Sequence, residues 1–420
     1  MTTRRLLATV VALEVASGLP FGAVNDLVPL WLRVQGVDLA SLGLLGLTGL
    51  PWTLKVLWGP WVDRTGTLAR WITGAMLVVI ACMLGMAWRA AVPGAADDLR
   101  WVGVLLVLTV FASATQDVAL DGWLVAATPE SLRGRVTGLR VAGYRVAMAL
   151  AGGGAAMIGA RWGWSVAFAA VAGLALAMLV LLGRVPSPSS WGGGGSPLRN
   201  ASPAVPSGVA GEGWWTALAD WARAPERLAL FAFVVLYKVG DAAMAPMTRP
   251  YLLASGLDAG GVGLLTSVTG IGGVSLGAVL GGEVVRRAGI RGALVWLGGA
   301  QAVSNLGYAA AAHVGGVGPA VAACAAEGLA TGLGSAALLS LLMAHSAGTE
   351  RQSATRFAAL SACGALTRTV AGAVSGFGAE RWGYAGWFAL TFLLALPALG
   401  LIPRITRASA LSQRASTAPA

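Results

Sequence analysis

Twelve long apolar stretches constrain the fold of this chain more than any other feature of its sequence. A helix needs about 20 apolar residues to cross the hydrocarbon core of a bilayer. Six such stretches precede residue 185, and six more follow residue 227. Their approximate limits are 8–32, 39–60, 70–90, 101–125, 134–158, 164–183, 228–254, 259–284, 291–312, 317–344, 353–378 and 384–403. We therefore predict an all-α membrane protein with twelve transmembrane helices.

Composition and charge agree with a membrane class. The chain is 56% hydrophobic and 11% charged, whereas soluble domains carry about 25% charged residues. A net charge of +11 would suggest a nucleic-acid partner in a soluble protein. Here the arginines fall in short loops, eighteen on the side of the termini and six on the other. The positive-inside rule then predicts cytoplasmic termini, a lipid bilayer as the surroundings and no nucleic-acid partner.

The two halves of the chain repeat each other. Residues 36–38 (Gly-Val-Asp) recur as residues 256–258 (Gly-Leu-Asp), at an offset of 220. Residues 161–163 (Arg-Trp-Gly) recur unchanged as residues 381–383 at the same offset. Two six-helix halves in the same orientation are the layout of a parallel-repeat transporter.

The repeat also suggests the domain organisation. We expect six-helix bundles over 1–184 and 227–404, and a cytoplasmic tail over 405–420. Between the bundles, residues 185–226 are rich in Pro, Ser and Gly, which is typical of a flexible linker. Within it, the tryptophans of 213–223 fall on roughly one helical face and predict a short amphipathic helix on the membrane surface, although they could simply belong to a Trp-rich linker.

A loop motif follows the second apolar stretch. Residues 59–66 (Gly-Pro-Trp-Val-Asp-Arg-Thr-Gly) resemble the loop signature of the major facilitator superfamily. The resemblance implies that Asp63 and Arg64 lock the end of a helix in one conformation and act in gating. A second copy occupies residues 282–289, but Arg286 stands where an aspartate is usual. We therefore expect the charge interaction of that loop to be missing from the second half.

The chain has only two lysines, Lys55 and Lys238, and both lie inside apolar stretches. An ammonium in a bilayer is costly unless it is paired or faces a water-filled cavity. Lys238 is three residues from Asp241, close enough to pair across one helical turn. This pair could act as a switch during transport, or it could be a static structural pair. Lys55 could instead extend to the cytoplasmic surface.

Two carboxylates share one face of the fourth stretch. Asp117 and Asp121 are four residues apart. Unscreened, they would repel, and one of them could hold a proton near neutral pH. Two alternatives remain open: Asp121 could belong to a cytoplasmic gate, and Arg145 could neutralise Asp117.

Several of these residues fall on motifs of one family. Residues 55–60 (Lys-Val-Leu-Trp-Gly-Pro), 114–117 (Ala-Thr-Gln-Asp), 236–241 (Leu-Tyr-Lys-Val-Gly-Asp) and 304–308 (Ser-Asn-Leu-Gly-Tyr) resemble those of the AmpG-type muropeptide permeases. The resemblance covers nearly all twelve stretches. It implies proton-driven import of anhydro-muropeptides across the bacterial inner membrane. Relatives with similar motifs carry ferric siderophores or acetyl-CoA.

The resemblance also implies site residues. Helices one, four, seven and ten line the central cavity in this fold, and acids occur on all four. The residues expected to bind substrate are Lys55, Gln116, Tyr144, Arg145, Tyr237, Lys238 and Asn305. The residues expected to couple protons or to gate are Asp63, Arg64, Asp117, Asp121, Asp241 and Glu327. The tyrosines and amides could equally be interhelical contacts.

Departures from the family pattern leave the substrate open. Gly328 follows Glu327 where asparagine is usual, and Leu124 follows Trp123 where lysine is usual. The chain contains no nucleotide-binding loop of the GxxxxGK[ST] type, no metal-ligand spacing of cysteines or histidines and no recognisable nucleophile. We therefore predict a secondary transporter, not an enzyme, that acts as a monomer without a cofactor.

Overall fold

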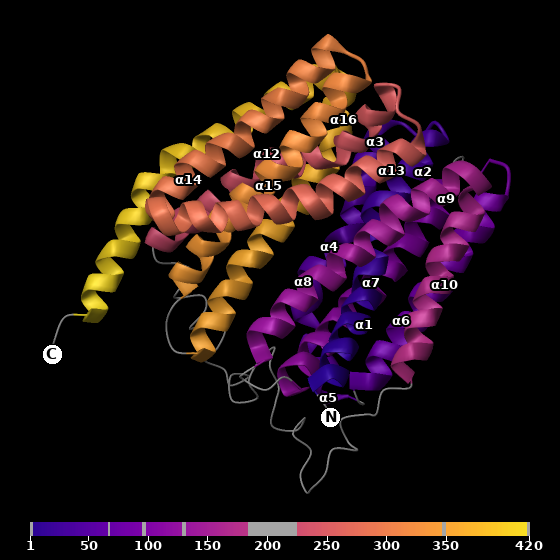
Figure 1. The fold of residues 1–420 in the computed structure, drawn as a ribbon, viewed down its shortest axis with the longest axis horizontal. Helices are drawn as coiled ribbons and strands as arrows, with labels where there is room; N and C mark the ends of the chain where they lie inside the picture. Colours follow the sequence, from indigo (N-terminus) through magenta and orange to yellow (C-terminus); the bar gives the residue numbers. More distant parts are fainter. Residues whose placement is uncertain are drawn as a thin grey trace, which may run out of the picture. The chain divides into compact units, whose positions relative to one another are not determined.

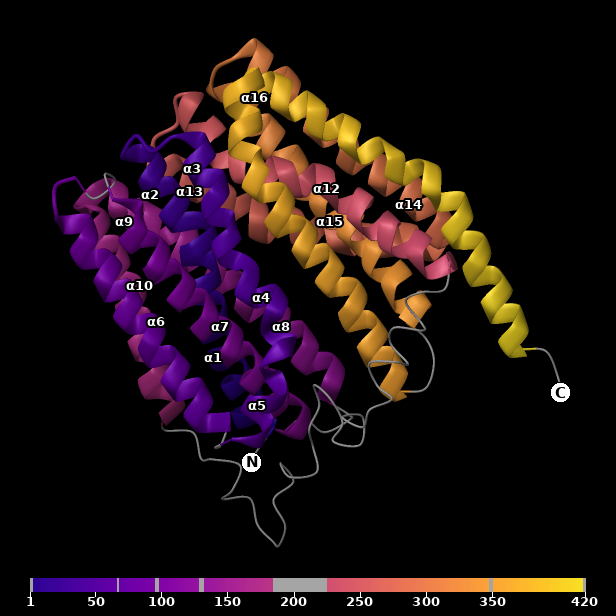
Figure 2. The same cartoon turned by 180° about the vertical axis from the view of Figure 1, so that it is seen from behind.

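The structure is a computed structural model that describes residues 3–65, 68–94, 98–127, 132–183, 225–346 and 350–417 (Figures 1 and 2). Every regular element in these ranges is a helix, which confirms the all-α fold class. Most of the predicted linker lies outside the described residues, including the amphipathic helix expected at 213–223.

Short turns interrupt the helices of the first half of the chain. The α-helices are α1 (Thr3–Gly22), α2 (Val28–Val34), α3 (Leu39–Leu45), α4 (Leu50–Leu54), α5 (Gly59–Arg64), α6 (Leu68–Ala91), α7 (Leu99–Ala127), α8 (Arg133–Ala149), α9 (Ala155–Trp162) and α10 (Trp164–Gly183). The joining turns are η1 (Ala23–Leu27), η2 (Gly46–Gly49), η3 (Lys55–Leu57) and η5 (Leu150–Gly154). Pro51 and Pro60 stand near the starts of α4 and α5. Proline is tolerated there but interrupts a helix further in, so the stretch 39–60 forms several short helices.

The helices of the second half are longer. They are α12 (Pro225–Ala254), α13 (Ala259–Val268), α14 (Val274–Val314), α15 (Val317–Ser346) and α16 (Glu350–Thr417), with the π-helical turn η8 (Thr269–Gly273) before α14. α14 and α16 each contain one residue with left-handed backbone, Gly289 (φ 69°) and Gly383 (φ 66°). Only glycine adopts this conformation at little cost, so each glycine ends one helix and allows another to begin.

Nine segments of the described residues are long and apolar enough to cross a membrane. Two of them, Ala259–Val314 and Ala362–Ile405, span Gly289 and Gly383 and each cover two predicted stretches. The predicted stretch 39–60 corresponds to a shorter apolar helix, Leu39–Leu54. The total of twelve crossings stays a prediction.

The chain forms two compact units. Unit 1 consists of Met1–Val37, Thr48–Ala210 and Asp258–Ser267, and unit 2 consists of Asp38–Leu47, Gly211–Leu257 and Val268–Ala420. In unit 1, α1 packs beside α8, and α6 packs beside both α7 and α10. In unit 2, α14 packs beside α15, and α12 packs beside α16 (Figures 1 and 2).

The sequence repeat appears as a repeated local geometry. Gly36 (φ 88°) and Gly256 (φ 103°) both end a helix in the left-handed conformation. Asp38 and Asp258 then cap the helices that follow, because their carboxylates accept hydrogen bonds from backbone N–H groups of the next turn. The N–H of Ser41, which donates to Asp38, lowers the pKa of that carboxyl group below its ordinary value.

Each unit has an apolar core and an apolar exterior. The core of unit 1 includes Val10 and Met76, and that of unit 2 includes Phe233 and Leu341. Many large apolar side chains are exposed, such as Trp296 at 74%. Such a surface is stable in lipid but not in water, which agrees with a multi-pass membrane protein.

Candidate functional site

Lys55 lies at a break in the second apolar segment, where α4 ends and η3 begins. Its Nζ atom is 3.6 Å from Oδ2 of Asp117 on α7. The hydroxyl of Ser17 on α1 donates to Oδ1 of the same carboxylate at 2.5 Å. Lys55 is therefore paired inside unit 1, which favours an interior role over extension to the surface. Asp117 thus has Lys55 as an ion-pair partner within the described residues.

A second ionic network in unit 1 centres on Arg140 of α8. Its Nε donates to Oε1 of Glu14 at 2.6 Å, and its Nη2 donates to Oδ1 of Asp121 at 2.5 Å. Within the described residues, Asp117 and Asp121 thus each have a cation of their own, and these cations screen the repulsion between the two carboxylates. Glu14 and Arg140 are not among the site residues predicted from the sequence, although a charge inside an apolar stretch is the signal that marks them.

Lys238 and Asp241 form an ion pair inside unit 2. Nζ and Oδ2 are 3.5 Å apart on α12, and the two side chains are 22% and 20% exposed. The ammonium is also 3.5 Å from Oγ of Ser335 on α15 and 5.8 Å from the ring centre of Tyr237. The contact across one helical turn expected from the sequence is present.

Gln301 on α14 is a further partner of Asp241 that the sequence did not predict. Its side-chain amide donates to Oδ2 of Asp241, and the residue is 2% exposed. The only sequence signal is a neutral polar residue inside the apolar stretch 291–312, which is much weaker than a buried charge.

The predicted tyrosines contribute to helix packing. The Tyr237 hydroxyl donates to the carbonyl of Gly334 at 3.2 Å, which favours an interhelical role. The Tyr144 ring packs against Phe21, with ring centres 5.7 Å apart, and Phe21 also contacts Trp52 at 4.8 Å. Arg145 follows Tyr144 on α8 and is partly exposed.

Two predicted amides are buried without partners. Gln116 is 1% exposed and Asn305 is 0% exposed, and neither side chain makes a hydrogen bond within the described part of the chain. A buried polar group without a partner costs about 1–3 kcal/mol and is uncommon. In this conformation a ligand would reach these amides only after their neighbours had moved.

Glu327 differs from the other predicted acids. It lies on α15, and the Thr331 hydroxyl of the same helix donates to its Oε1 at 2.7 Å. Within the described residues no cation lies within 4.0 Å of it, whereas Asp117, Asp121 and Asp241 each have one. A carboxylate without a cation is costly inside a membrane.

The two loop motifs differ in what can be described. Asp63 and Arg64 belong to α5, but their side chains lie outside the described residues. In the second copy, Glu283 accepts hydrogen bonds from both Arg286 and Arg287, at 2.5–2.7 Å. The expected loss of the superfamily's loop interaction stays a prediction, and the structure shows a local charge network within one helix. All three side chains are well exposed, so this network adds little stability.

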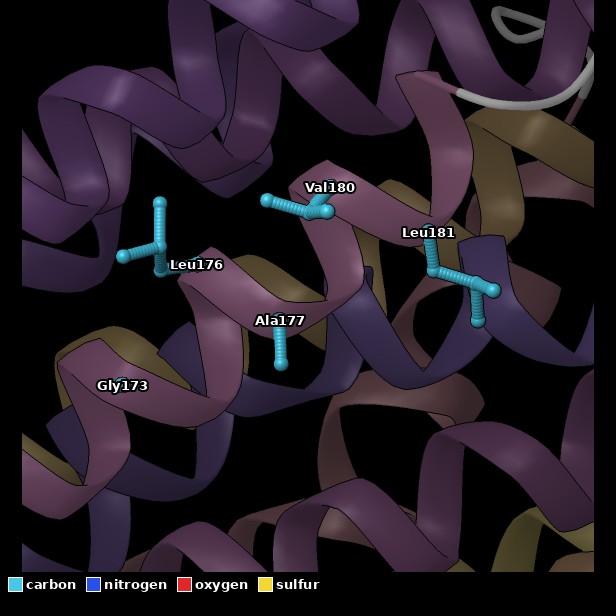
Figure 3. Close-up of a pocket in the computed structure, with 5 residues that line it drawn as sticks. All are labelled: Gly173, Leu176, Ala177, Val180 and Leu181. Carbon is cyan, nitrogen blue, oxygen red and sulfur yellow. The ribbon is translucent and has the colours of Figure 1, made fainter.

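A shallow pocket lies apart from these charges. Figure 3 shows its lining by five residues of α10, namely Gly173, Leu176, Ala177, Val180 and Leu181. Their spacing places them along one exposed face of the helix. The pocket contains none of the predicted site residues, and its small apolar side chains suit contact with lipid.

The helical fold and the intramembrane ion pairs define a class of protein. Residues 10–355 match the model of the Major Facilitator Superfamily. A crystal structure of a D-xylose-proton symporter superimposes with a TM-score of 0.72 at 14% identity, over 96% of this chain and 97% of that one. The chain therefore belongs to the Major Facilitator Superfamily of membrane transporters.

Sequence comparison narrows the assignment. The chain is 30% identical to the Anhydromuropeptide permease of Escherichia coli K12 over 406 residues, which cover 94% of this chain and 78% of the relative. It is 23% identical to the Putative transporter AmpG 4 of Rickettsia conorii, over 93% of this chain and 94% of the relative. Within the superfamily, the chain is a member of this permease family.

Proposed function

We propose that this protein is a proton-coupled transporter that imports anhydro-muropeptides across the bacterial inner membrane. Similarity over 94% of the chain to a permease named for that substrate supports the substrate class. In this proposal the chain acts as a monomer by alternating access, with both termini in the cytoplasm. The alternative substrate is a siderophore or an acyl-CoA-like anion, because Leu124 and Gly328 depart from the family pattern.

The observation that carries the proposal is a lysine–aspartate pair inside each unit. The pairs are Lys55–Asp117 at 3.6 Å and Lys238–Asp241 at 3.5 Å. None of the four side chains is more than 34% exposed, yet none is completely buried. Such a cation can exchange its internal carboxylate for one carried by a substrate.

The exchange accounts for coupling to protons. When a substrate carboxylate binds to the ammonium of Lys238, Asp241 loses its counter-ion. An uncompensated charge left by breaking a fully buried pair costs about 3–5 kcal/mol, and the partial exposure of Lys238 and Asp241 lowers that cost here. Binding a proton removes that charge, so one substrate anion and one proton enter together and the local charge stays constant. The same reasoning applies to Lys55 and Asp117.

Glu327 has a separate part in the proposal. Because its described polar partner is the Thr331 hydroxyl and not a cation, it is suited to hold a proton while the site is without substrate. Arg145, with its positive charge, and the amides Gln116 and Asn305 would engage the peptide and sugar groups once their neighbours had moved.

Uptake into proteoliposomes tests the proposal. Labelled anhydro-muropeptide, ferric siderophore and acetyl-CoA would be offered separately, with and without an inward proton gradient. We expect muropeptide to accumulate only with the gradient, and protein-free liposomes serve as the control. Accumulation of another probe without muropeptide, or equal uptake without a gradient, would contradict the proposal.

A further inference from the structure

Gln301 and Lys238 converge on the same oxygen of Asp241. Gln301 lies on α14, is 2% exposed and donates from Nε2 to Oδ2 of Asp241. That oxygen is also the one that lies 3.5 Å from Nζ of Lys238. The carboxylate therefore has two competing donors, one charged and one neutral.

The oxygen of the Gln301 side-chain amide accepts no hydrogen bond from the described residues. Oε1 is buried and has no hydrogen-bond partner within the described residues. It lies against Gly334 of α15, where a Cβ atom would come within 1.8 Å of it. Any side chain at position 334 would displace the amide, so the glycine makes room for it. An acceptor is thus held beside Asp241 without a donor.

The chemistry of a carboxamide explains this arrangement. An ammonium can only donate, so Lys238 suits the ionised carboxylate alone. A carboxamide both donates and accepts, so it suits either form of the carboxyl group. After a half-turn of its terminal bond, Gln301 would accept the O–H of a protonated Asp241 at Oε1.

We propose that Gln301 is a positioning residue that holds Asp241 in both protonation states and thereby allows Lys238 to leave for an anionic group of the substrate. The inference rests on the proposed function, which it deepens at the same site. The proton comes from water on one side of the membrane and forms an O–H bond at Asp241. It returns to water on the other side when Lys238 pairs again with the carboxylate.

A static structural role predicts different behaviour. If Gln301 only ties α12 to α14, its removal would lower stability and reduce all transport modes equally. If Gln301 positions Asp241, its removal would reduce accumulation of substrate, which needs net proton movement. Exchange of substrate, which needs none, would continue.

The test compares Gln301→Leu with the wild type in proteoliposomes. We expect gradient-driven accumulation of labelled anhydro-muropeptide to fall about tenfold, as for loss of one hydrogen bond to a charged group. Exchange of labelled for unlabelled substrate at equal pH should persist. Thr391→Val is the matched control, because the Thr391 hydroxyl is buried in unit 2 and, among the described residues, donates to the Phe388 carbonyl of its own helix.

Gln301→Glu supplies a pH-dependent rescue. A protonated carboxyl group has one donor and retains acceptor capacity, so it can replace the amide, whereas an ionised one repels Asp241. We expect accumulation by this variant to recover only at acidic pH. Accumulation by Gln301→Leu at the wild-type level and with the wild-type pH profile would overturn the proposal.

An infrared measurement separates this inference from the proposed function. The carboxylic C=O band of Asp241 is identified by its loss in Asp241→Asn, and no substrate is needed. In Gln301→Leu we expect the pH at which this band is half-developed to move by about one unit. An unchanged band would overturn the inference. If the wild type transports no probe but the band moves, the proposed function fails and the positioning role stands.

Discussion

Removing either partner of the Lys55–Asp117 pair will destabilise unit 1, and removing both will cost less than the sum. Two unit charges 3.6 Å apart attract by about 4.6 kcal/mol at an effective dielectric constant of about 20 and by about 1.2 kcal/mol in water. Lys55 and Asp117 are 34% and 20% exposed, so solvent screens part of this energy. We expect a coupling energy of about 2 kcal/mol.

A double-mutant cycle measures this coupling. Lys55→Met, Asp117→Asn and the double variant would be unfolded reversibly in mixed micelles, and their free energies of unfolding would be compared with the wild type. The pair Glu283 and Arg286 serves as the control, because these side chains are 40% and 68% exposed. Their cycle should give a coupling indistinguishable from zero.

The result would refute the reasoning if the Lys55–Asp117 cycle also gave no coupling. The two side chains would then be solvated independently. A buried exchangeable pair could no longer explain why a lysine stands inside the second apolar stretch.

Substitutions at Arg140, Glu327 and His345 should each have a measurable effect. Arg140→Gln should lower the free energy of unfolding by about 3 kcal/mol, because it leaves Glu14 buried without its cation. Adding Glu14→Gln in a double variant should restore part of that loss. If the double variant were no more stable than Arg140→Gln alone, the network would be contradicted. Glu327→Gln, which keeps a hydrogen-bonding partner for Thr331, should abolish gradient-driven accumulation while substrate exchange continues, and unchanged accumulation would exclude Glu327 as a proton site. Burial lowers the pKa of His345 below its ordinary value of 6.5. Below pH 6.5 the unfolded chain therefore binds a proton at His345 more readily than the folded chain does, and thermal stability should fall as the pH falls through 6.5. His345→Gln should make this dependence of stability on pH weaker.

The sequence was most informative where one residue type determines the local geometry. The glycines at 36, 256 and 383 were identified from repeated triplets, and each adopts the left-handed conformation that glycine tolerates best. Asp38 and Asp258, taken from the same repeat, both cap helices. The Lys238–Asp241 pair was predictable as well, since residues three apart are neighbours on a helix.

Contacts between helices were less predictable. Ser17 and Asp117 are 100 residues apart, and Glu14 and Arg140 are 126 apart. Their pairing depends on how each helix is rotated about its axis, and α7 is apolar on most of its surface. In a helix surrounded by lipid and other helices, apolar residues do not mark one face. For this reason the sequence indicated that Asp117 and Asp121 share one helix face, but not which cation each of them contacts.

Neutral polar residues were the hardest to assign. Gln301 carries no charge and lies in no motif used to identify the site, yet it contacts Asp241. Gln116 and Asn305 were predicted through motifs and are buried without partners in this conformation. A single amide in an apolar stretch is compatible with either packing or binding, and only the neighbouring helices distinguish the two.

Substrate-driven proton movement tests the central claim most directly. Anhydro-muropeptide would be added to lightly buffered, de-energised proteoliposomes while the external pH is recorded. We predict a rise in external pH with the wild type and none with Asp241→Asn. Entry of muropeptide without a change in pH, or an equal change with Asp241→Asn, would contradict it.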